Sequence, residues 1–418
     1  MKMNYRVKKA LCLTMTAAVM AGGLFCGCSA DIGKIVGGEE TTTSAKATEK
    51  PMEASLLVWD GRIDISDEDG GWLPLMCEQF EALHTNWQLD ISYGICEPEN
   101  AVESVLKDVS AAGDVIFFED DDFDTLVKGG ALKAFSKDNY EKEKSVAGEE
   151  MCSKFVSNGQ LYGIPYSTQT MLIFYDKSAY KRENDDVTTM YGLMQNGRVA
   201  FDMTDPDVLS AFFIAAGAVS TNADGKQYID FNKEGSPAAL AVQYLFVLSE
   251  SDKFLNDVDG MGLAGLRDGS VKVMFGTIED YQDAQEALGK KLGVAALPIV
   301  EIGTVQSRLK SFASVNAIGV NKLTKSSEVS EELAVFLGST SAQDYHYDMN
   351  SVIPVYRSEK NDALTAAQNE AFEISSVMRS DFYFPKGYEE ALVTLGKGIV
   401  DGSINRENYL KYLENMPK

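Results

Sequence analysis

Asn158 to Lys177 read Asn-Gly-Gln-Leu-Tyr-Gly-Ile-Pro-Tyr-Ser-Thr-Gln-Thr-Met-Leu-Ile-Phe-Tyr-Asp-Lys. The apolar run Met171–Tyr175 is typical of a buried β-strand, because it is short and continuous. Pro165 lies before it and favours an extended connector, since its ring fixes φ and removes a hydrogen-bond donor. The stretch therefore predicts a connector that leads into a buried strand.

On the N-terminal side of this stretch, apolar runs alternate with segments of helical periodicity. Leu73, Met76, Phe80 and Leu83 have the spacing of one buried helix face. Such alternation predicts an α/β fold with a mostly parallel sheet covered on both faces. The predicted strands are 55–59, 87–93 and 114–118, and the predicted helices are 73–84, 101–111 and 123–130.

The C-terminal side continues in the same way. A last helix is expected to open at Ser403, whose hydroxyl suits an N-cap. A hairpin is expected over 221–231. The other predicted elements are strands at 271–275 and 294–298 and helices at 206–217, 236–249, 328–337 and 389–399.

The composition excludes several classes of protein. The 418 residues suit two or three domain-sized units, and the net charge of −25 argues against a nucleic-acid binder. The two histidines, His84 and His346, are expected at the surface and leave little for a histidine-based metal site or triad. No catalytic residue, metal site or cofactor is predicted.

The N-terminus predicts export. Residues 1–27 combine a basic head with a short apolar stretch, the pattern of a secretory signal. The Gly27-Cys28 end resembles a bacterial lipobox, which implies lipidation (palmitate) of Cys28; an ordinary cleaved signal is the alternative. Residues 28–54 carry no aromatic residue and are predicted to be a flexible tether.

Three cysteines remain in the body, namely Cys77, Cys96 and Cys152. Three cannot form a disulfide framework, so buried thiols are favoured. A Cys77–Cys96 bridge stays open at this point.

Six segments along the body, in order, resemble those of the extracellular solute-binding proteins of ABC importers, maltose/maltodextrin-type branch. The most specific is the stretch 158–177, where that family writes NGKLYGxP and then a strand ending in YNK; here Asp176 replaces the usual Asn. The others are Leu57–Trp59, Gly113–Phe117, Gly130–Lys133, Asp268–Gly276 and Gly293–Pro298.

The resemblance implies two α/β lobes joined by a hinge that the chain crosses three times, near 166–171, 294–299 and 345–353. The N-terminal lobe would comprise 55–168 and 298–345, and the C-terminal lobe 169–297 and 346–418. The family works by closing its lobes on a solute and presenting it to a membrane permease.

A sugar site needs flat aromatic rings and planar polar groups, and in α/β folds it lies at the carboxyl ends of strands. The resemblance places Gln169 where the family often has a ligand-bonding Glu, Asp205 where it has an acid, and Phe384 or Tyr388 where it has a stacking ring. A charge run such as Glu119–Asp124 can also be a solvated loop, and Trp59 can be core. The candidate ligand-binding residues are Asp60, Arg62, Phe118, Asp120, Asp121, Tyr166, Gln169, Asp205, Glu279, Tyr281, Phe384 and Tyr388.

The resulting hypothesis is a receptor that is lipid-anchored on the extracellular face of the cell membrane and delivers an oligosaccharide or related sugar to the transmembrane subunits of an ABC permease. It is expected to be a monomer that meets the membrane only through its lipid. The three tryptophans all lie near the start of the body, which argues against maltose itself. The alternatives are the same transport role for a polyamine or peptide, and a secreted carbohydrate-active enzyme.

Overall fold

The computed structural model describes residues 50–65, 71–182, 185–221, 227–229, 234–356, 362–382 and 384–417. The chain divides into two compact units. Unit 1 takes the described residues up to Tyr166 and Ala317–Asn350, and unit 2 takes Ser167–Asn316 and Ser351 onward. In these ranges, no helix has the length and apolar character needed to cross a bilayer. The signal segment and Cys28 lie outside the described residues.

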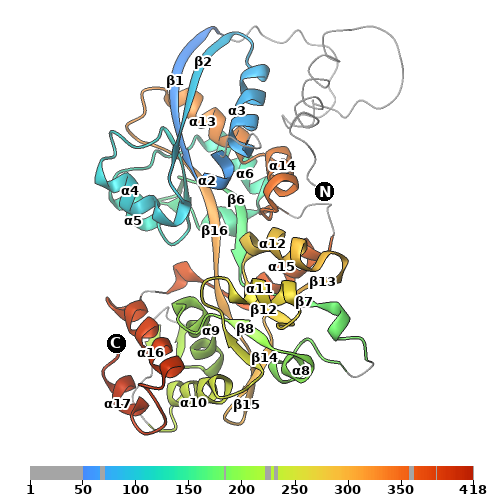
Figure 1. Ribbon diagram of the computed structural model, residues 1–418. Coiled ribbons are helices and arrows are strands. Elements are labelled where there is room, and N and C mark those ends of the chain that lie inside the picture. The colour runs from blue at the N-terminus through green and yellow to red at the C-terminus, as the bar shows by residue number, and fades with distance from the viewer. Residues whose placement is uncertain are drawn as a thin grey trace. The chain divides into compact units, whose positions relative to one another are not determined.

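Unit 1 is built on a largely parallel sheet (Figure 1). Strand β1 (Met52–Asp60) lies between β2 (Trp87–Ile95) and β3 (Val115–Glu119) and is parallel to both. Strand β16 (Ser311–Val320) follows β3 in the sheet, and β6 (Ile164–Thr170) pairs with β16. Strand β3 is almost wholly buried, as its sequence Val-Ile-Phe-Phe-Glu requires.

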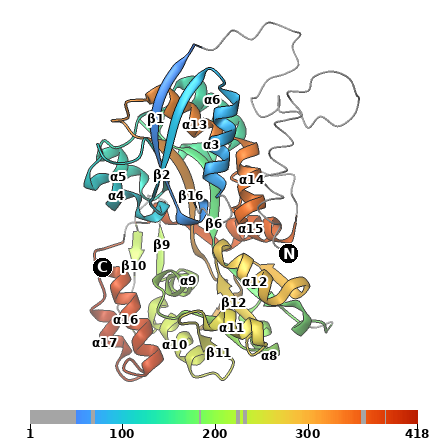
Figure 2. The same ribbon diagram turned by 45° about the horizontal axis from the view of Figure 1, so that its top comes forward.

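Helices α3 (Trp72–Leu83), α13 (Ser327–Leu337) and α14 (Thr340–Asn350) pack on one another beside this sheet (Figure 2). Their apolar faces account for the packing, with Leu73, Met76 and Phe80 of α3 buried as its spacing predicts. The other helices and the small hairpin of unit 1 are α2 (Arg62–Ile65), α4 (Ala101–Lys107), α5 (Phe123–Lys128), α6 (Lys137–Val146), α7 (Glu149–Ser153), β4 (Val156–Ser157) and β5 (Gln160–Leu161).

Within the stretch 158–166, Gly163 lies where close packing leaves no room for a side chain. A Cβ atom on Gly163 would lie 2.9 Å from the Phe118 ring and 3.0 Å from the Ala317 Cβ atom. A Cβ atom on Gly319 would lie 2.8 Å from the Cε1 atom of the same ring. Glycine therefore lets the start of β6 and the end of β16 both approach Phe118.

Unit 2 has a mixed five-stranded sheet in the order β11-β8-β12-β7-β13. Strands β11, β8 and β12 are parallel, whereas β7 runs antiparallel to both β12 and β13. The buried strand expected at 171–175 is β7 (Leu172–Asp176). The remaining bounds are β11 (Phe254–Asn256), β8 (Val199–Phe201), β12 (Val273–Gly276) and β13 (Leu292–Ala295).

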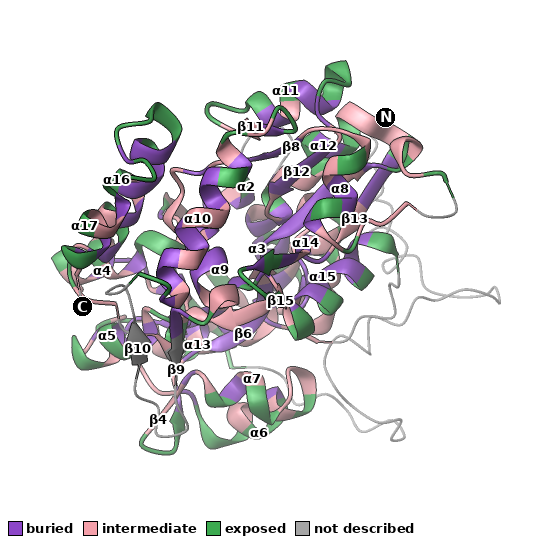
Figure 3. Ribbon diagram, turned by 90° about the horizontal axis from the view of Figure 1, so that it is seen from below, coloured by how far each residue is buried: buried purple, intermediate pink, exposed green. Residues whose placement is uncertain are grey.

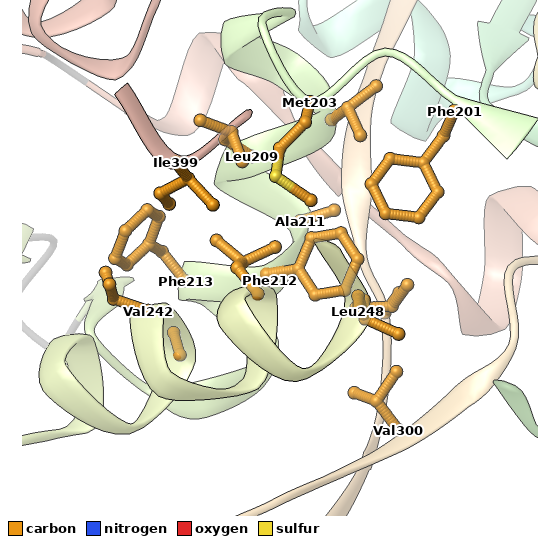
Figure 4. Packing of buried hydrophobic residues seen from close by; sticks show 14 of the residues in the cluster. Phe201, Met203, Leu209, Ala211, Phe212, Phe213, Val242, Leu248, Val300 and Ile399 are labelled. Atoms are coloured by element: carbon orange, nitrogen blue, oxygen red, sulfur yellow. The ribbon is translucent and has the colours of Figure 1, made fainter. Parts of the chain in front are cut away.

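The core of unit 2 lies between α9 (Pro206–Ala216), α10 (Pro237–Ser249) and α16 (Tyr388–Asp401). Phe201, Phe212, Phe213, Val242 and Leu248 meet there, and Figure 4 shows their side chains interlocking. The other elements of the unit are α8 (Met190–Asn196), α11 (Met261–Asp268), α12 (Tyr281–Leu288), α15 (Ala363–Ile374), α17 (Tyr409–Glu414), β9 (Val219–Thr221), β10 (Gln227–Ile229), β14 (Ile299–Ile302), β15 (Val305–Arg308) and β17 (Ser376–Met378).

The division of the chain between the units differs from the expected one at two places. The chain passes from one unit to the other after Tyr166, Asn316 and Asn350, so residues 298–316 belong to unit 2. The reason is the hairpin β14–β15, which packs on α8, α9 and α10 and buries Val300 and Ile302 in the unit 2 core. Residues 346–350 belong to unit 1, because α14 continues to Asn350.

The prediction for the last helix is wrong. Helix α17 starts at Tyr409, after Asn408, and not at Ser403. The segment between them is a turn in which the Asn408 amide group donates to the Ser403 carbonyl at 2.8 Å. The one apolar residue of the segment, Ile404, is therefore buried from a turn and not from a helix.

Candidate functional site

The end of β1 in unit 1 carries the first candidate residues. The Asp60 carboxylate is fully buried; its Oδ1 accepts from the Gly61 N–H at 2.8 Å, and its Oδ2 has no hydrogen-bond partner among the described residues. Burial, and next the nearby Asp64, raise the pKa of Asp60 well above its usual value. Arg62 is exposed, and its backbone N–H donates to Glu97 Oε1 at 3.0 Å. Arg62 is therefore the accessible member of this pair.

His346 was expected at the surface, and this is wrong. It is buried, and its Nε2 lies 2.7 Å from Asp64 Oδ1. Its ring stacks on Trp72 with centroids 4.0 Å apart and planes 9° from parallel. The Asn350 amide also donates to Asp64 Oδ1, at 2.6 Å. This cluster ties α2 and α3 to the end of α14 and leaves no role for His346 at an exposed site.

Tyr166 lies against the same cluster. It is buried, with its ring 6.0 Å from that of His346 and nearly parallel to it, and 5.2 Å from Phe117 in a T-shaped arrangement. These contacts favour a packing role in unit 1.

The acidic loop after β3 has buried and exposed members. Phe118 is fully buried against Phe155, with centroids 5.7 Å apart, which favours a packing role. Asp120 is buried and Asp121 exposed. Burial and the charge of Asp121 raise the pKa of Asp122 to about 7. The loop thus carries less negative charge near neutral pH than its sequence suggests.

Unit 2 brings together charged groups far apart in the sequence. Arg379 Nη1 donates to Asp207 Oδ1 at 2.9 Å, and Arg379 Nη2 pairs with Glu389. The guanidinium also lies over the Phe312 ring, 5.1 Å from its centroid. Burial raises the pKa of Asp207, whereas the charge of Arg379 lowers it.

Aromatic rings surround this ion pair. Phe384 stacks on Tyr388, with centroids 4.3 Å apart and planes 14° from parallel. Phe384 also meets the edge of Phe312 at 5.4 Å. Phe384 is half-buried, whereas Tyr388 is buried. We call this group the Arg379 cluster; its members are Asp207, Phe312, Arg379, Phe384, Tyr388 and Glu389.

The cluster brings together two regions that were expected to contribute to the site. These are the acidic residues at the start of α9 and the aromatic residues at the start of α16. Sequence reasoning missed Arg379, Phe312 and Glu389. The only sequence feature that points to Arg379 is its position as a single cationic residue beside an aromatic stretch. No feature of the neighbouring sequence points to Phe312. Asp205, a candidate in its own right, caps α9 by accepting from the N–H groups of Asp207 at 2.8 Å and Val208 at 3.4 Å.

The remaining candidates lie elsewhere in unit 2. Gln169 is half-buried in β6, next to Thr170, whose hydroxyl lies 3.1 Å from that of Ser311. Glu279 is exposed, and Tyr281 is half-buried at the start of α12 with its ring 6.4 Å from Phe174.

The Arg379 cluster offers planar donors and acceptors beside aromatic faces. A guanidinium and two carboxylates can each bond a pair of neighbouring hydroxyls, and a half-buried ring can cover the apolar face of a sugar. Among the described residues, no group of three or more His, Cys, Asp or Glu side chains could hold a metal ion. Cys77, Cys96 and Cys152 are buried free thiols, which answers the question of a Cys77–Cys96 bridge.

The chain is similar to known binding proteins in sequence. A galactooligosaccharide-binding protein of Bacillus subtilis (strain 168) is 23% identical over 353 residues, which cover 78% of each chain. A maltooligosaccharide ABC transporter solute-binding lipoprotein of Streptococcus pneumoniae serotype 4 (strain ATCC BAA-334 / TIGR4) is 23% identical over 247 residues, covering 52% of this chain and 56% of the relative.

Solved structures show the same fold. One structure, solved with acarbose, has a TM-score of 0.77 and 29% identity and covers 87% of this chain and 97% of its own. A maltodextrin-binding protein of L. casei BL23, solved without ligand, has a TM-score of 0.71, 19% identity and the same coverage. These matches confirm the expected α/β fold of the two-lobed binding-protein type.

A family model described as "Bacterial extracellular solute-binding protein" matches residues 76–373, most of the chain. The match includes the stretch 158–177 and two members of the Arg379 cluster, Asp207 and Phe312, whereas the other four members lie beyond its C-terminal end, at residues 379–389. The chain therefore belongs to the bacterial extracellular solute-binding protein family, as the resemblance of its six segments implied.

Proposed function

We propose that this protein is an oligosaccharide receptor of an ABC importer, and that the Arg379 cluster contacts the sugar. The observation that carries the proposal is the meeting of Arg379, Asp207 and Glu389 with the stacked rings of Phe384 and Tyr388. The names of the relatives, which refer to galactooligosaccharides and maltooligosaccharides, support the same class of solute.

The electrostatics of the candidate residues favour a neutral solute over a polyamine. Asp207 and Glu389 both pair with Arg379, whose single positive charge offsets one of their two negative charges. In unit 1, the pKa values of Asp60 and Asp122 are raised, to about 7 for Asp122, which reduces the negative charge of the acidic residues there. A polycation needs carboxylates whose charge is not offset by a neighbouring cation. Sugar hydroxyls can donate hydrogen bonds to carboxylates that already form an ion pair.

The transport steps are part of the proposal. The two units close on the sugar about the three chain crossings, and the closed form is read by the permease. The protein acts as a monomer held by a lipid on Cys28, with residues 28–54 as the tether. Metabolic labelling with palmitate, lost in a Cys28→Ser variant, tests the anchor separately from sugar binding.

A thermal-shift screen tests the class of solute. The panel contains maltooligosaccharides, galactooligosaccharides, acarbose, spermidine and short peptides. A bound solute stabilises the protein by RT ln(1 + [L]/Kd), so at about 100 times Kd the gain is about 2.7 kcal/mol and the melting temperature rises by a few degrees. We expect an oligosaccharide to raise the melting temperature equally at low and high salt. A shift with spermidine or peptides only, weakened by salt, would overturn the sugar proposal.

A further inference from the structure

Unit 2 contains a groove that belongs to none of the sites described so far. Its cavity volume is about 610 Å³, within the range of small-molecule sites. Residues of α8, α10 and the hairpin β14–β15 line it, and α8 and α10 each pack against β14 (Figure 1). No member of the Arg379 cluster lines it.

The apolar part of the groove has a buried base and an exposed rim. Met190, Leu248 and Val300 are buried and continue into the unit 2 core. Tyr191 is 75% exposed and Val247 is 56% exposed. Figure 3 shows that α10 consists mostly of buried and intermediate residues. A tyrosine this open at the edge of a cavity presents a flat aromatic face to whatever enters it.

The polar part consists of planar groups and one cation, namely Gln195, Lys253, Glu301 and Gln306. Glu301 and Gln306 face each other across the antiparallel pair β14–β15, so their side chains emerge on the same side of the hairpin. In the described part of the chain, none of the four side chains makes a hydrogen bond or ion pair. Their donors and acceptors are therefore available to a ligand.

These features distinguish between classes of ligand. Lys253 and Glu301 cancel in charge, which disfavours a strongly charged ligand. A wholly apolar occupant would remove water from four unpaired polar groups, which costs free energy for each. A neutral molecule with apolar faces and many hydroxyls meets both parts of the lining, and a saccharide has this chemistry.

We propose that this groove is a second saccharide-binding site, in which the Tyr191 ring covers one sugar face while Gln195, Glu301 and Gln306 bond hydroxyls. It lies wholly within unit 2 and does not depend on the Arg379 cluster. Such a site would retain a long glycan or a second chain while the receptor binds its transported solute elsewhere.

Affinity electrophoresis of the full chain in native gels that contain soluble starch or galactan tests the proposal. The variants are Tyr191→Ala, Gln306→Ala and Arg379→Ala, and Tyr345→Ala is the control for loss of a partly exposed tyrosine in unit 1. We expect at least one polymer to retard the wild type, Arg379→Ala and Tyr345→Ala. Tyr191→Ala should bind that polymer about tenfold more weakly, and Gln306→Ala severalfold more weakly.

Two results would overturn this inference. One is the absence of retardation of Arg379→Ala by either polymer, and the other is equal retardation of Tyr191→Ala and the wild type. Binding of the apolar dye 1-anilinonaphthalene-8-sulfonate that needs Tyr191, without binding of polymer, would identify the groove as a surface for an apolar partner and also contradict the proposal. Failure of the solute screen with retardation intact would count against the proposed function alone.

Discussion

The candidate residues of unit 1 and those of unit 2 make different kinds of contact in the folded protein. In unit 1, Asp60, Phe118 and Tyr166 are buried, and the rings of Phe118 and Tyr166 pack against Phe155 and Phe117. In unit 2, the candidates Phe384 and Tyr388 meet Asp207 and Arg379, and the four form a group with the chemistry of a sugar site. The comparison teaches that a polar or aromatic residue at a strand end can equally serve packing or binding, and that the partners decide which.

The largest expected effect is on the stability of unit 1. Trp72 is fully buried, stacks on His346 and donates from Nε1 to the Ala342 carbonyl at 2.9 Å. We expect Trp72→Ala to lower the free energy of unfolding by about 3–5 kcal/mol, as for other large aromatic-to-alanine changes in cores. Urea denaturation measures this. If the free energy of unfolding hardly changes while sugar affinity falls, the division of roles between the two units is wrong.

The next effect is on binding by unit 2. Arg379→Ala removes the partner of Asp207 and Glu389 and the cation over Phe312. We expect affinity for the solute found in the screen to fall about 100-fold, a loss of about 2.7 kcal/mol. Isothermal titration calorimetry provides the value. Arg406→Ala is the control, because Arg406 also forms an ion pair, with Glu250 at 2.9 Å, and lies over the Phe246 ring. A comparable loss in both variants would remove the special role of Arg379.

A pH dependence of stability is expected from a buried acid of unit 1. Burial raises the pKa of Glu143 in α6 to about 8, and its Oε2 has no hydrogen-bond partner in the described residues. Since the folded state holds this proton more tightly than the unfolded state, stability falls as pH rises from about 4.5 to about 8. Because glutamine does not ionise, Glu143→Gln should abolish this loss. At pH 8 the variant should be more stable than the wild type by about 2 kcal/mol or more.

Denaturation of the wild type and Glu143→Gln at pH 5 and pH 8.5 makes the comparison. At pH 5 the two proteins should differ little, and at pH 8.5 the variant should be the more stable. Parallel pH profiles of the two proteins would show that Glu143 does not titrate as its burial implies.

A smaller effect is expected where the two units share the stretch 158–177. Gly163→Ala would bring a Cβ atom within 2.9 Å of the Phe118 ring. We expect a loss of about 1–2 kcal/mol in the free energy of unfolding, typical of overpacking. Gly159 has no heavy atom within 4 Å of a built Cβ but has a φ of +74°, so Gly159→Ala isolates the cost of backbone strain. If Gly163→Ala costs nothing, tight packing does not explain this glycine.

Much of the fold could be predicted from local patterns. The spacing of α3 and the buried run of β3 match the expected elements within a few residues. Strand β16 escaped prediction, because Ser311, Ser314 and Asn316 interrupt its apolar run. Those polar groups are accommodated by the fold, for example Asn316, which donates to the Ser167 hydroxyl at 3.2 Å from 149 residues away.

The residues of the candidate site could be predicted only in part, because they meet through contacts between segments far apart in the sequence. The acid before α9 and the rings before α16 were marked by the resemblance, but Arg379 and Asp207 are 172 residues apart and meet only in the folded chain. His346 was misplaced because its partner Asp64 is 282 residues away. Polar contacts between residues far apart in the sequence leave no periodic signal in it.

The affinity of Phe384→Ala for the identified oligosaccharide tests most directly whether the Arg379 cluster binds the solute. Tyr412→Ala is the matched control, because both rings are partly buried against the same core of unit 2 and Tyr412 has no described contact with the cluster. Tyr388→Ala is less informative, since Tyr388 is buried and its loss would lower stability. By calorimetry, we expect Phe384→Ala to weaken binding about tenfold or more and Tyr412→Ala to leave it unchanged. Equal affinity of Phe384→Ala and the wild type would contradict the account.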